Sequence, residues 1–353
     1  MEAPGDGGTA VRISEVAPPW LAVPPKGYGG IEWVVALLVD GLAERGHDVT
    51  LFATGDSETR ARLEYAFERA PGPRFINDPW HDTLHTLTAF RDPSRFDVIH
   101  VHSPWSALVA GVLSGVPTVH TLHGSFTPEM RRLYHEVADR VWFVAISQAQ
   151  RRQMEELRYA GVVYNGIDLA RYPFREEKED FLLFLGRAAP EKGLRRAVLA
   201  AREAGARLVC ALKIAHPTEE EEWERNVKPL LTDRIEVRGE IAHEEKAELL
   251  ARARAVLFPI DWDEPFGLVM TEAMACGTPV IATPRGSVPE VIADGETGFI
   301  VSVERYPEEA ARALERLGEI DPRACRERVR RLFSKEAMVE GYERVFATAL
   351  GAR

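Results

Sequence analysis

The sequence predicts an α/β protein that is built from two parallel sheets. Short apolar runs of strand length alternate with helical patterns along the whole chain, which is typical of parallel strands joined by crossover helices. The chain of 353 residues is long enough for two domains with separate cores. A charged connector at residues 175–180 precedes a second strand–helix series, so we expect the domain boundary near residue 172.

The expected elements follow from apolar runs that are bounded by turn residues. In the first part, the predicted strands are residues 11–17, 49–53, 97–101, 117–122 and 141–145, and the predicted helices are 31–45, 58–69 and 79–91. In the second part, the predicted strands are residues 181–186, 208–212, 235–239, 255–259 and 280–283. Two or three helices are expected between residues 304 and 350.

The composition disfavours several classes of partner. Lys and Arg total 44 against 55 Asp and Glu, a net charge of −11, which disfavours nucleic acid and peripheral contact with an anionic membrane. Cys210, Cys276 and Cys325 lie far apart and are expected to be reduced core thiols. We find no signal peptide before the first strand and no apolar run near the roughly 20 residues of a membrane span. These features predict a cytoplasmic protein without a transmembrane segment.

The clearest functional signal lies in residues 261–290. Pro265 and Gly267 stand where a helix would begin, and the Cys-Gly-Thr-Pro of residues 276–279 would end it. Unpaired N–H groups and a partial positive charge in the first turn favour a phosphate. Glu264 and Glu272 would be separated by roughly 12 Å of helix rise. The pattern therefore suits an elongated anion with hydroxyl groups at both ends, such as a nucleotide sugar. The alternative is a surface helix whose glutamates face water.

Two further segments have residues that suit phosphate. Gly29 and Gly30 lie between a predicted strand and a predicted helix, and adjacent glycines permit close approach to backbone N–H donors. Arg187 and Lys192 follow the first strand of the second domain; Arg can bind two phosphate oxygens and Lys adds a point charge. A flexible turn and ordinary surface cations are the alternatives. The glycine loop is not a GxGxxG string, which disfavours a dinucleotide oxidoreductase.

Histidines cluster near the ends of two predicted strands, and they are His100, His102, His120 and His123. Pairs at i and i+2 share one strand face, so a metal site is conceivable. No carboxylate or cysteine completes a ligand set, so we expect no metal there. His81 and His85 share a helical face without the glutamate of an HExxH motif and are expected to be ordinary helix residues.

The string EPFGLVMTEAMACGTPVIA, followed by GSVPEVIADGETGFIV, resembles the signature of the family-4 retaining glycosyltransferases of GT-B fold. The resemblance runs from near residue 27 to at least Val301 and is to group 1 enzymes such as glycogen synthases and mannosyltransferases. It implies two Rossmann-like domains that face a central cleft. Residues 1–172 would form the acceptor domain and residues 173–334 the nucleotide-sugar donor domain, with the helix at 335–353 returning to the first domain.

The resemblance assigns roles residue by residue. Positions that match the family's catalytic residues are His123, Glu264, Arg187 and Lys192. Positions that match its donor-binding residues are Gly29, Gly30, Ile241, Phe266, Gly267, Leu268 and Glu272. His123 would lie beside the transferred sugar, Glu264 would bind sugar hydroxyls, and Glu272 would bind ribose. Ala188 and Ala189 replace the more usual polar or bulky pair between the two phosphate-binding cations.

The implied activity is retaining transfer of a hexose from a UDP-sugar, or alternatively a GDP-sugar, to a hydroxyl of a soluble small-molecule or glycan acceptor. The family uses positive side chains and helix termini in place of a metal, so we expect no cofactor and interpret Asp261-Trp262-Asp263 as a strand-end loop. Tyr28, Asp56 and Trp105, with Trp20, are candidates for the acceptor pocket. The alternatives are a sugar-nucleotide epimerase, a glycan phosphorylase and a non-catalytic nucleotide-sugar-binding module; an oxidoreductase is least favoured.

Overall fold

The computed structural model describes residues 10–27, 29–103 and 105–351, which fold into two parallel α/β units. Unit 1 contains the described residues within 1–146, 154–163 and 338–353, and unit 2 contains residues 147–153 and 164–337. The sequence suggests a domain boundary near residue 172. In the structure the chain passes from unit 1 to unit 2 between Val163 and Tyr164. Among the described residues, no helix combines the length and the apolar character that crossing a membrane requires.

Unit 1 is organised around a seven-stranded parallel sheet with the order β3-β2-β1-β4-β5-β6-β7. Its strands are β1 (Arg12–Val16), β2 (Asp48–Ala53), β3 (Arg62–Tyr65), β4 (Val98–Val101), β5 (Thr118–Leu122), β6 (Trp142–Ala145) and β7 (Tyr159–Val162). Its helices are α1 (Gly30–Glu44), α2 (Pro79–Ala89), α3 (Ser106–Ser114), α4 (Pro128–Val137) and, from Met338 on, α13 (Lys335–Gly351). The strand order reverses between β1 and β4.

The core of unit 1 explains why these segments form a doubly covered sheet. Val16, Phe52 and Ile99 from three neighbouring strands pack together with Ala107 of α3. Strands that are buried on both faces require nearly continuous apolar runs, as parallel sheets generally do. Against this background the buried Glu15, His100 and Thr121 of β1, β4 and β5 are exceptional, and they lie in the carboxyl-terminal halves of their strands.

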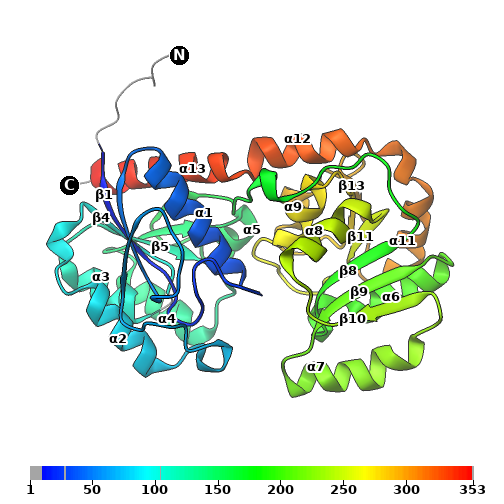
Figure 1. The fold of residues 1–353 in the computed structure, drawn as a ribbon, viewed down its shortest axis with the longest axis horizontal. Coiled ribbons are helices and arrows are strands. Elements are labelled where there is room, and N and C mark those ends of the chain that lie inside the picture. The colour runs from blue at the N-terminus through cyan, green and yellow to red at the C-terminus, as the bar shows by residue number, and fades with distance from the viewer. Residues whose placement is uncertain (1–9, 28, 104, 352–353) are drawn as a thin grey trace, which may run out of the picture. The chain divides into compact units, whose positions relative to one another are not determined.

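Unit 2 has a six-stranded parallel sheet with the order β10-β9-β8-β11-β12-β13. Its strands are β8 (Leu182–Arg187), β9 (Leu208–Lys213), β10 (Ile235–Arg238), β11 (Ala255–Phe258), β12 (Val280–Ala282) and β13 (Gly298–Ile300). Its helices are α5 (Gln148–Arg151), α6 (Leu194–Glu203), α7 (Pro217–Glu222), α8 (His243–Arg252), α9 (Leu268–Ala275), α10 (Val288–Val291), α11 (Tyr306–Glu315) and α12 (Pro322–Leu332). Helix α6 packs on α11, while α9 packs on α8 and α12 (Figure 1).

Two differences from the predicted elements have physical causes. The helix predicted at residues 58–69 is wrong, because Arg62–Tyr65 forms the edge strand β3 and pairs with β2. Long polar side chains in this segment favour a helix locally, but pairing with an existing sheet edge outweighs that preference. The strands β7 and β13 were not predicted; they have only four and three residues. The remaining predicted strands are confirmed with small shifts at their ends.

Candidate functional site

The predicted phosphate-binding residues of unit 2 gather where the strand order of its sheet reverses, between β8 and β11. Arg187 is the last residue of β8, and the loop after β11 leads through Glu264 into α9. Ligands of open α/β sheets bind beyond the carboxyl ends of the strands at such a point. The topology therefore places these residues at the expected location for a ligand site.

Glu264 and Lys192 are in direct contact. Lys192 Nζ lies 2.6 Å from Glu264 Oε2, and the Trp262 Nε1–H donates to the same oxygen at 3.1 Å. The Lys192 ammonium also lies 4.5 Å from the centroid of the Trp262 ring. Both ionic side chains are largely buried, with 20% and 12% of their surface exposed. A carboxylate and a cation are thus held together at the start of α9.

The segment Arg285–Ser287 fixes the backbone of the Glu264 loop. Ser287 N–H donates to the Glu264 carbonyl at 2.9 Å, and Ser287 Oγ–H donates to the Phe266 carbonyl at 2.7 Å. Gly286 has φ +54°, and a Cβ at this position would lie 2.3 Å from the Glu264 carbonyl oxygen. Only glycine permits this close approach, so the position of Glu264 depends on it.

Helix α9 presents an uncapped N-terminus and a strongly bound C-terminus. Gly267, with φ +80°, is the N-cap and provides no side-chain hydrogen bond, as the predicted helix start requires. At the other end, Lys178 Nζ donates to the Cys276 carbonyl at 3.0 Å, and Arg326 donates to the Ala275 carbonyl. Burial lowers the pKa of Lys178 to about 8. Cations at the C-terminus complement the helix dipole, and its positive end remains available to an anion.

Glu272 is buried on α9 and takes part in an ion pair. Its Oε1 accepts hydrogen bonds from Lys246 Nζ at 2.6 Å and from the Tyr172 hydroxyl at 2.8 Å. Burial raises the pKa of Glu272, but Lys246 and Tyr172 lower it by more, so the pKa is below its usual value. With Glu272 6% exposed and the Glu264 side chain 12% exposed, the alternative of glutamates that simply face water is wrong.

Arg187 is held by two carboxylates. Its Nη1 donates to Glu219 Oε1 at 2.7 Å and its Nη2 donates to Glu191 Oε1 at 3.3 Å. Glu219 is almost completely buried, and its other oxygen accepts the Ala215 N–H at 2.7 Å. This partner was not predicted, because Glu219 lies on α7, which follows β9 rather than β8. The Arg187 side chain is 31% exposed, so it is not closed off from a ligand.

The predicted base-contacting residue Ile241 and the Asp261-Trp262-Asp263 loop lie apart from these contacts. Asp261 accepts hydrogen bonds from Arg196 at 2.6 Å and from Arg285 at 3.1 Å. Ile241 is half-buried just before α8, and Lys213 at the end of β9 lies 3.3 Å from Glu240. The DxD-like loop therefore contributes its first aspartate to an ion-pair network with two arginines.

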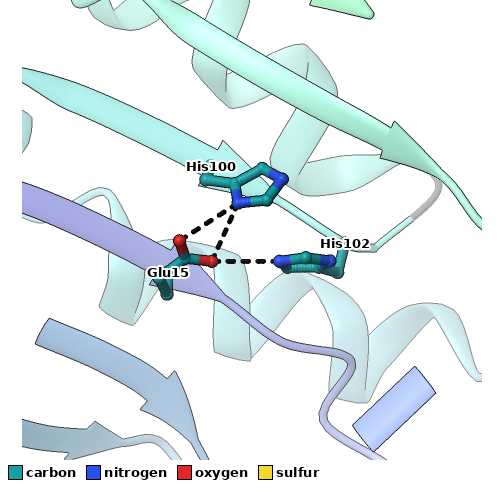
Figure 2. Close-up of side chains that lie close together, drawn as sticks. All are labelled: Glu15, His100 and His102. Atoms are coloured by element: carbon teal, nitrogen blue, oxygen red, sulfur yellow. Dashed lines mark hydrogen bonds and ion pairs between the residues drawn. The ribbon is translucent and has the colours of Figure 1, made fainter. Parts of the chain in front are cut away.

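In unit 1, a buried carboxylate lies between two of the predicted histidines (Figure 2). Glu15 Oε2 lies 3.0 Å from His100 Nδ1 and 3.0 Å from His102 Nε2, and all three side chains are fully buried. The expectation that no carboxylate completes this cluster is wrong. Glu15 belongs to β1 and stands opposite His100 of β4, 85 residues away in the chain. A charged residue within an apolar strand was the available signal.

The cluster extends to the predicted catalytic histidine. His102 Nδ1 lies 2.8 Å from His123 Nε2, and the two rings are stacked with centroids 5.1 Å apart. On the other side, His100 Nε2 lies 2.8 Å from Thr121 Oγ1, which lies 2.9 Å from the Tyr342 hydroxyl. Burial lowers the pKa of His100, His102 and His123 to about 3, which keeps these rings neutral near pH 7.

Gly29 and Gly30 stand at the N-terminus of α1, as predicted, but a carboxyl group shares this helix end. A Cβ on Gly29 would lie 2.7 Å from Pro25 Cγ and 2.8 Å from Glu32 Oε2. Glu32 is 5% exposed in the first turn of α1, and burial raises its pKa to about 7. A protonated Glu32 would carry no charge to oppose an anion at this helix end.

The predicted acceptor residues are not assembled by the described contacts. Tyr28 lies outside the described residues. Asp56 Oδ1 accepts hydrogen bonds from Thr54 Oγ1 at 2.7 Å and from the Ala70 N–H at 3.0 Å. Trp105 is half-buried at the start of α3, and Trp20 is 4% exposed in the core. An acceptor role for these residues stays a prediction.

Comparison with known proteins relates both units to one enzyme group. Residues 169–332 match the family model described as glycosyl transferases group 1, and residues 28–171 match the model described as glycosyltransferase family 4. A D-inositol 3-phosphate glycosyltransferase from Acidothermus cellulolyticus is 30% identical over 397 residues, covering 92% of this chain and 87% of that protein. A phosphatidyl-myo-inositol mannosyltransferase from Mycolicibacterium smegmatis is 28% identical, covering 83% and 81%.

A solved structure agrees with these matches. The crystal structure of AviGT4, a glycosyltransferase involved in avilamycin A biosynthesis, is similar over 97% of this chain and 99% of that chain, with a TM-score of 0.74 and 29% sequence identity. The similarity thus extends over both α/β units.

The close approach at Gly286 leads to a stability prediction. Gly286→Ala should destabilise the protein more than Gly295→Ala. Both glycines have positive φ, but a Cβ at 286 meets the Glu264 backbone while a Cβ at 295 meets nothing within 4 Å. We expect Gly295→Ala to cost about 1–2 kcal/mol from backbone strain and Gly286→Ala roughly 1–3 kcal/mol more. Urea unfolding measures both, and equal losses would contradict the steric role of Gly286.

The buried histidines predict acid sensitivity. The pKa values of His100, His102 and His120 are lowered to about 3, whereas an unfolded histidine titrates near about 6.5. Below about pH 6.5 the unfolded chain therefore binds protons that the folded chain excludes, and stability falls by at most roughly 1.4 kcal/mol per pH unit for each histidine. The raised pKa values of Glu15 and Glu32 act in the opposite direction and offset part of this loss.

Differential scanning calorimetry between pH 7.5 and pH 5 checks this acid sensitivity. The melting temperature should decrease continuously once the pH passes below about 6.5. A constant melting temperature over this interval would contradict the neutral state of the buried rings.

Proposed function

Because this chain belongs to the group 1 and family 4 glycosyltransferases of GT-B architecture, we propose that it transfers a hexose from a nucleoside-diphosphate sugar to a hydroxyl group with retention of anomeric configuration. A UDP-sugar is the proposed donor, with a GDP-sugar as the alternative. The observation that carries this proposal is the contact between Lys192 and Glu264 at the uncapped N-terminus of α9.

The unit 2 site suits a sugar diphosphate for electrostatic reasons. The first-turn amides of α9 would face the phosphates, and the helix dipole adds partial positive charge there. Lys192 and the exposed part of Arg187 would bind the same phosphates, with Glu264 accepting hydrogen bonds from sugar hydroxyls. Glu272, whose Oε1 binds Lys246 and Tyr172, would use Oε2 for the ribose. Ile241 would pack on the nucleobase.

The proposed chemistry depends on stabilising the leaving group. The bond from the anomeric carbon to the β-phosphate oxygen breaks, and negative charge develops on the departing diphosphate. Lys192, Arg187 and the α9 amides are fixed before the reaction and would stabilise that charge without reorganisation. The acceptor oxygen attacks from the face that the diphosphate leaves, and a phosphate oxygen takes the acceptor proton. His123, Gly29 and Gly30 of unit 1 are proposed to serve the same reaction.

The names of two relatives support a polyol acceptor. One acts on D-inositol 3-phosphate and another on phosphatidyl-myo-inositol, according to their names. We propose a soluble acceptor, because the net charge of −11 does not favour an anionic membrane surface. Inositol and inositol phosphates are therefore the first acceptors to test.

Removing the proposed phosphate-binding cations tests the donor site. Lys192→Ala and Arg187→Ala should each lower kcat about 10²- to 10³-fold, because each removes positive charge where negative charge develops. Lys228→Ala is the matched control, since Lys228 pairs with Glu224 on an exposed helical surface of the same unit. The measurement is product formation by mass spectrometry with UDP-, GDP- and ADP-sugars.

The same products decide between the rival activities. Wild-type rates in both variants would disprove the phosphate-binding assignment. An altered sugar nucleotide without acceptor would indicate an epimerase, and a product formed from sugar phosphate would indicate a phosphorylase. NMR of the transferred anomer tests retention directly.

A chelator should leave the activity unchanged. Asp261 is bound to Arg196 and Arg285, so its carboxylate already has cationic partners. The assay compares initial rates before and after extensive treatment with EDTA. Loss of activity that Mg²⁺ or Mn²⁺ restores would show that the Asp261-Trp262-Asp263 loop binds a metal after all.

A further inference from the structure

We propose that Glu15 and His102 are positioning residues that fix the tautomer of His123, so that His123 presents an unprotonated Nδ1 to the substrate. The statement that Nδ1 faces a substrate rests on the proposed sugar transfer. The tautomer itself is a property of the protein alone and can be tested without activity.

The fold supplies a rigid base for this arrangement. Glu15 and His100 are paired in the register of β1 and β4. The backbone N–H of His102 donates to the Val16 carbonyl at 2.9 Å. The backbone on both sides of the carboxylate is therefore fixed by the sheet. Figure 2 shows both imidazole rings directed at the Glu15 carboxylate.

The proton positions follow from counting donors and acceptors. Burial raises the pKa of Glu15, and the hydrogen bond and the charge of His102 oppose this rise. In the proposed state Glu15 is ionised; its carboxylate then only accepts, so His100 Nδ1 and His102 Nε2 both carry protons. A neutral imidazole has a single N–H, which leaves His102 Nδ1 as an acceptor. The partner at 2.8 Å, His123 Nε2, must then be the donor. His123 is neutral as well, so its Nδ1 has no proton.

The other branch of the cluster agrees with this assignment. With Nδ1 protonated, His100 Nε2 is an acceptor, and it takes the Thr121 hydroxyl proton at 2.8 Å. Thr121 Oγ1 can then accept the Tyr342 hydroxyl proton at 2.9 Å. Every one of these buried groups has a partner of the opposite kind, which is the expected state for a polar network inside a protein.

The tautomer determines what His123 can do. Its ring is half-buried, and within the described part of the chain no residue bonds to Nδ1. An unprotonated nitrogen accepts a hydrogen bond from a sugar hydroxyl and tolerates positive charge that develops on the sugar ring. An N–H at the same position would repel that charge. The buried carboxylate thus selects the favourable form of a residue that it does not touch.

The same three side chains have the composition of a metal site, with two histidines and a carboxylate whose ligand atoms lie within 4.8 Å of one another. A metal would need unprotonated His100 Nδ1 and His102 Nε2. The proton of His102 would then move to Nδ1, and the bond to His123 would reverse. All three side chains are fully buried, and their hydrogen bonds are satisfied without an ion. We therefore favour the hydrogen-bonded network, and the two states predict opposite tautomers.

Long-range ¹H–¹⁵N NMR of the full chain with ¹⁵N-labelled histidine tests the proposal, with metal content measured on the same sample. We expect His123 Nε2 at the protonated shift and Nδ1 at the unprotonated shift in metal-free protein. A protonated His123 Nδ1 would overturn the proposal, either through a protonated Glu15 in metal-free protein or through a bound metal. A protein that lacks transferase activity but shows the expected tautomer would overturn only the proposed function.

Glu15→Gln is the sharpest variant because it keeps the side-chain shape and replaces one acceptor by an N–H donor. The amide can accept from His100 and donate to His102 Nε2, which should reverse the His102 and His123 tautomers. We expect kcat to fall on the order of 10²-fold with a smaller change in the donor KM. An unchanged His123 tautomer in folded Glu15→Gln protein would contradict the proposal.

Tyr342→Phe is the matched control. It removes the hydroxyl that bonds to Thr121 but leaves the path from Glu15 through His102 to His123 intact. His123 should keep its wild-type shifts in this variant. A reversed tautomer in Tyr342→Phe would show that general disturbance of the cluster, rather than the Glu15 charge, controls His123.

Discussion

The unit 2 site depends on a difference between the two ends of α9: side chains bind the carbonyls at its C-terminus, but no side chain caps its N-terminus. Lys178 and Arg326 bind the last carbonyls of the helix, while Gly267 begins it without a side-chain cap. The helix is buried against α8 and α12, which fixes its axis, and within the described part of the chain the first-turn amides of Leu268 and Val269 have no hydrogen-bond partner. Unsatisfied donors at a fixed position attract an anion. The cations at the far end thus favour the proposed phosphate site at the first turn, which they do not contact.

Ion pairs hold the side chains around this helix in place. Such pairs add little net stability, because desolvation of both partners offsets their attraction. Their value here is positional: Lys192 holds Glu264, Lys246 holds Glu272, and Glu219 holds Arg187. A ligand that binds Lys192 or Arg187 must compete with these carboxylates. Phosphate is suited to that competition, because it offers several charged oxygens to the same cations.

The sequence predicted what depends on local order, and it failed where distant segments meet. The start of α9 at Gly267 and its end at Cys276-Gly277 were predicted, because caps are local signals. The residues 58–69 were misassigned because pairing with β2 decided the structure of Arg62–Tyr65. Glu15 was missed as a partner of His100 because only the strand order β1-β4 brings them together. The pairing of Arg187 with Glu219 was missed for the same reason, because Glu219 lies on the later helix α7.

The two units show how one topology supports two electrostatic environments. Both sheets reverse their strand order beside the first strand, and in both the functional side chains lie near the carboxyl ends of the strands. In unit 2 these side chains are charged and partly open, which suits an anionic ligand. In unit 1 Glu15, His100 and His102 are buried and His123 is half-buried, and burial lowers the pKa of His102 and His123 to about 3. Neutral rings around one carboxylate can control proton position, because each ring contributes a directed donor and a directed acceptor.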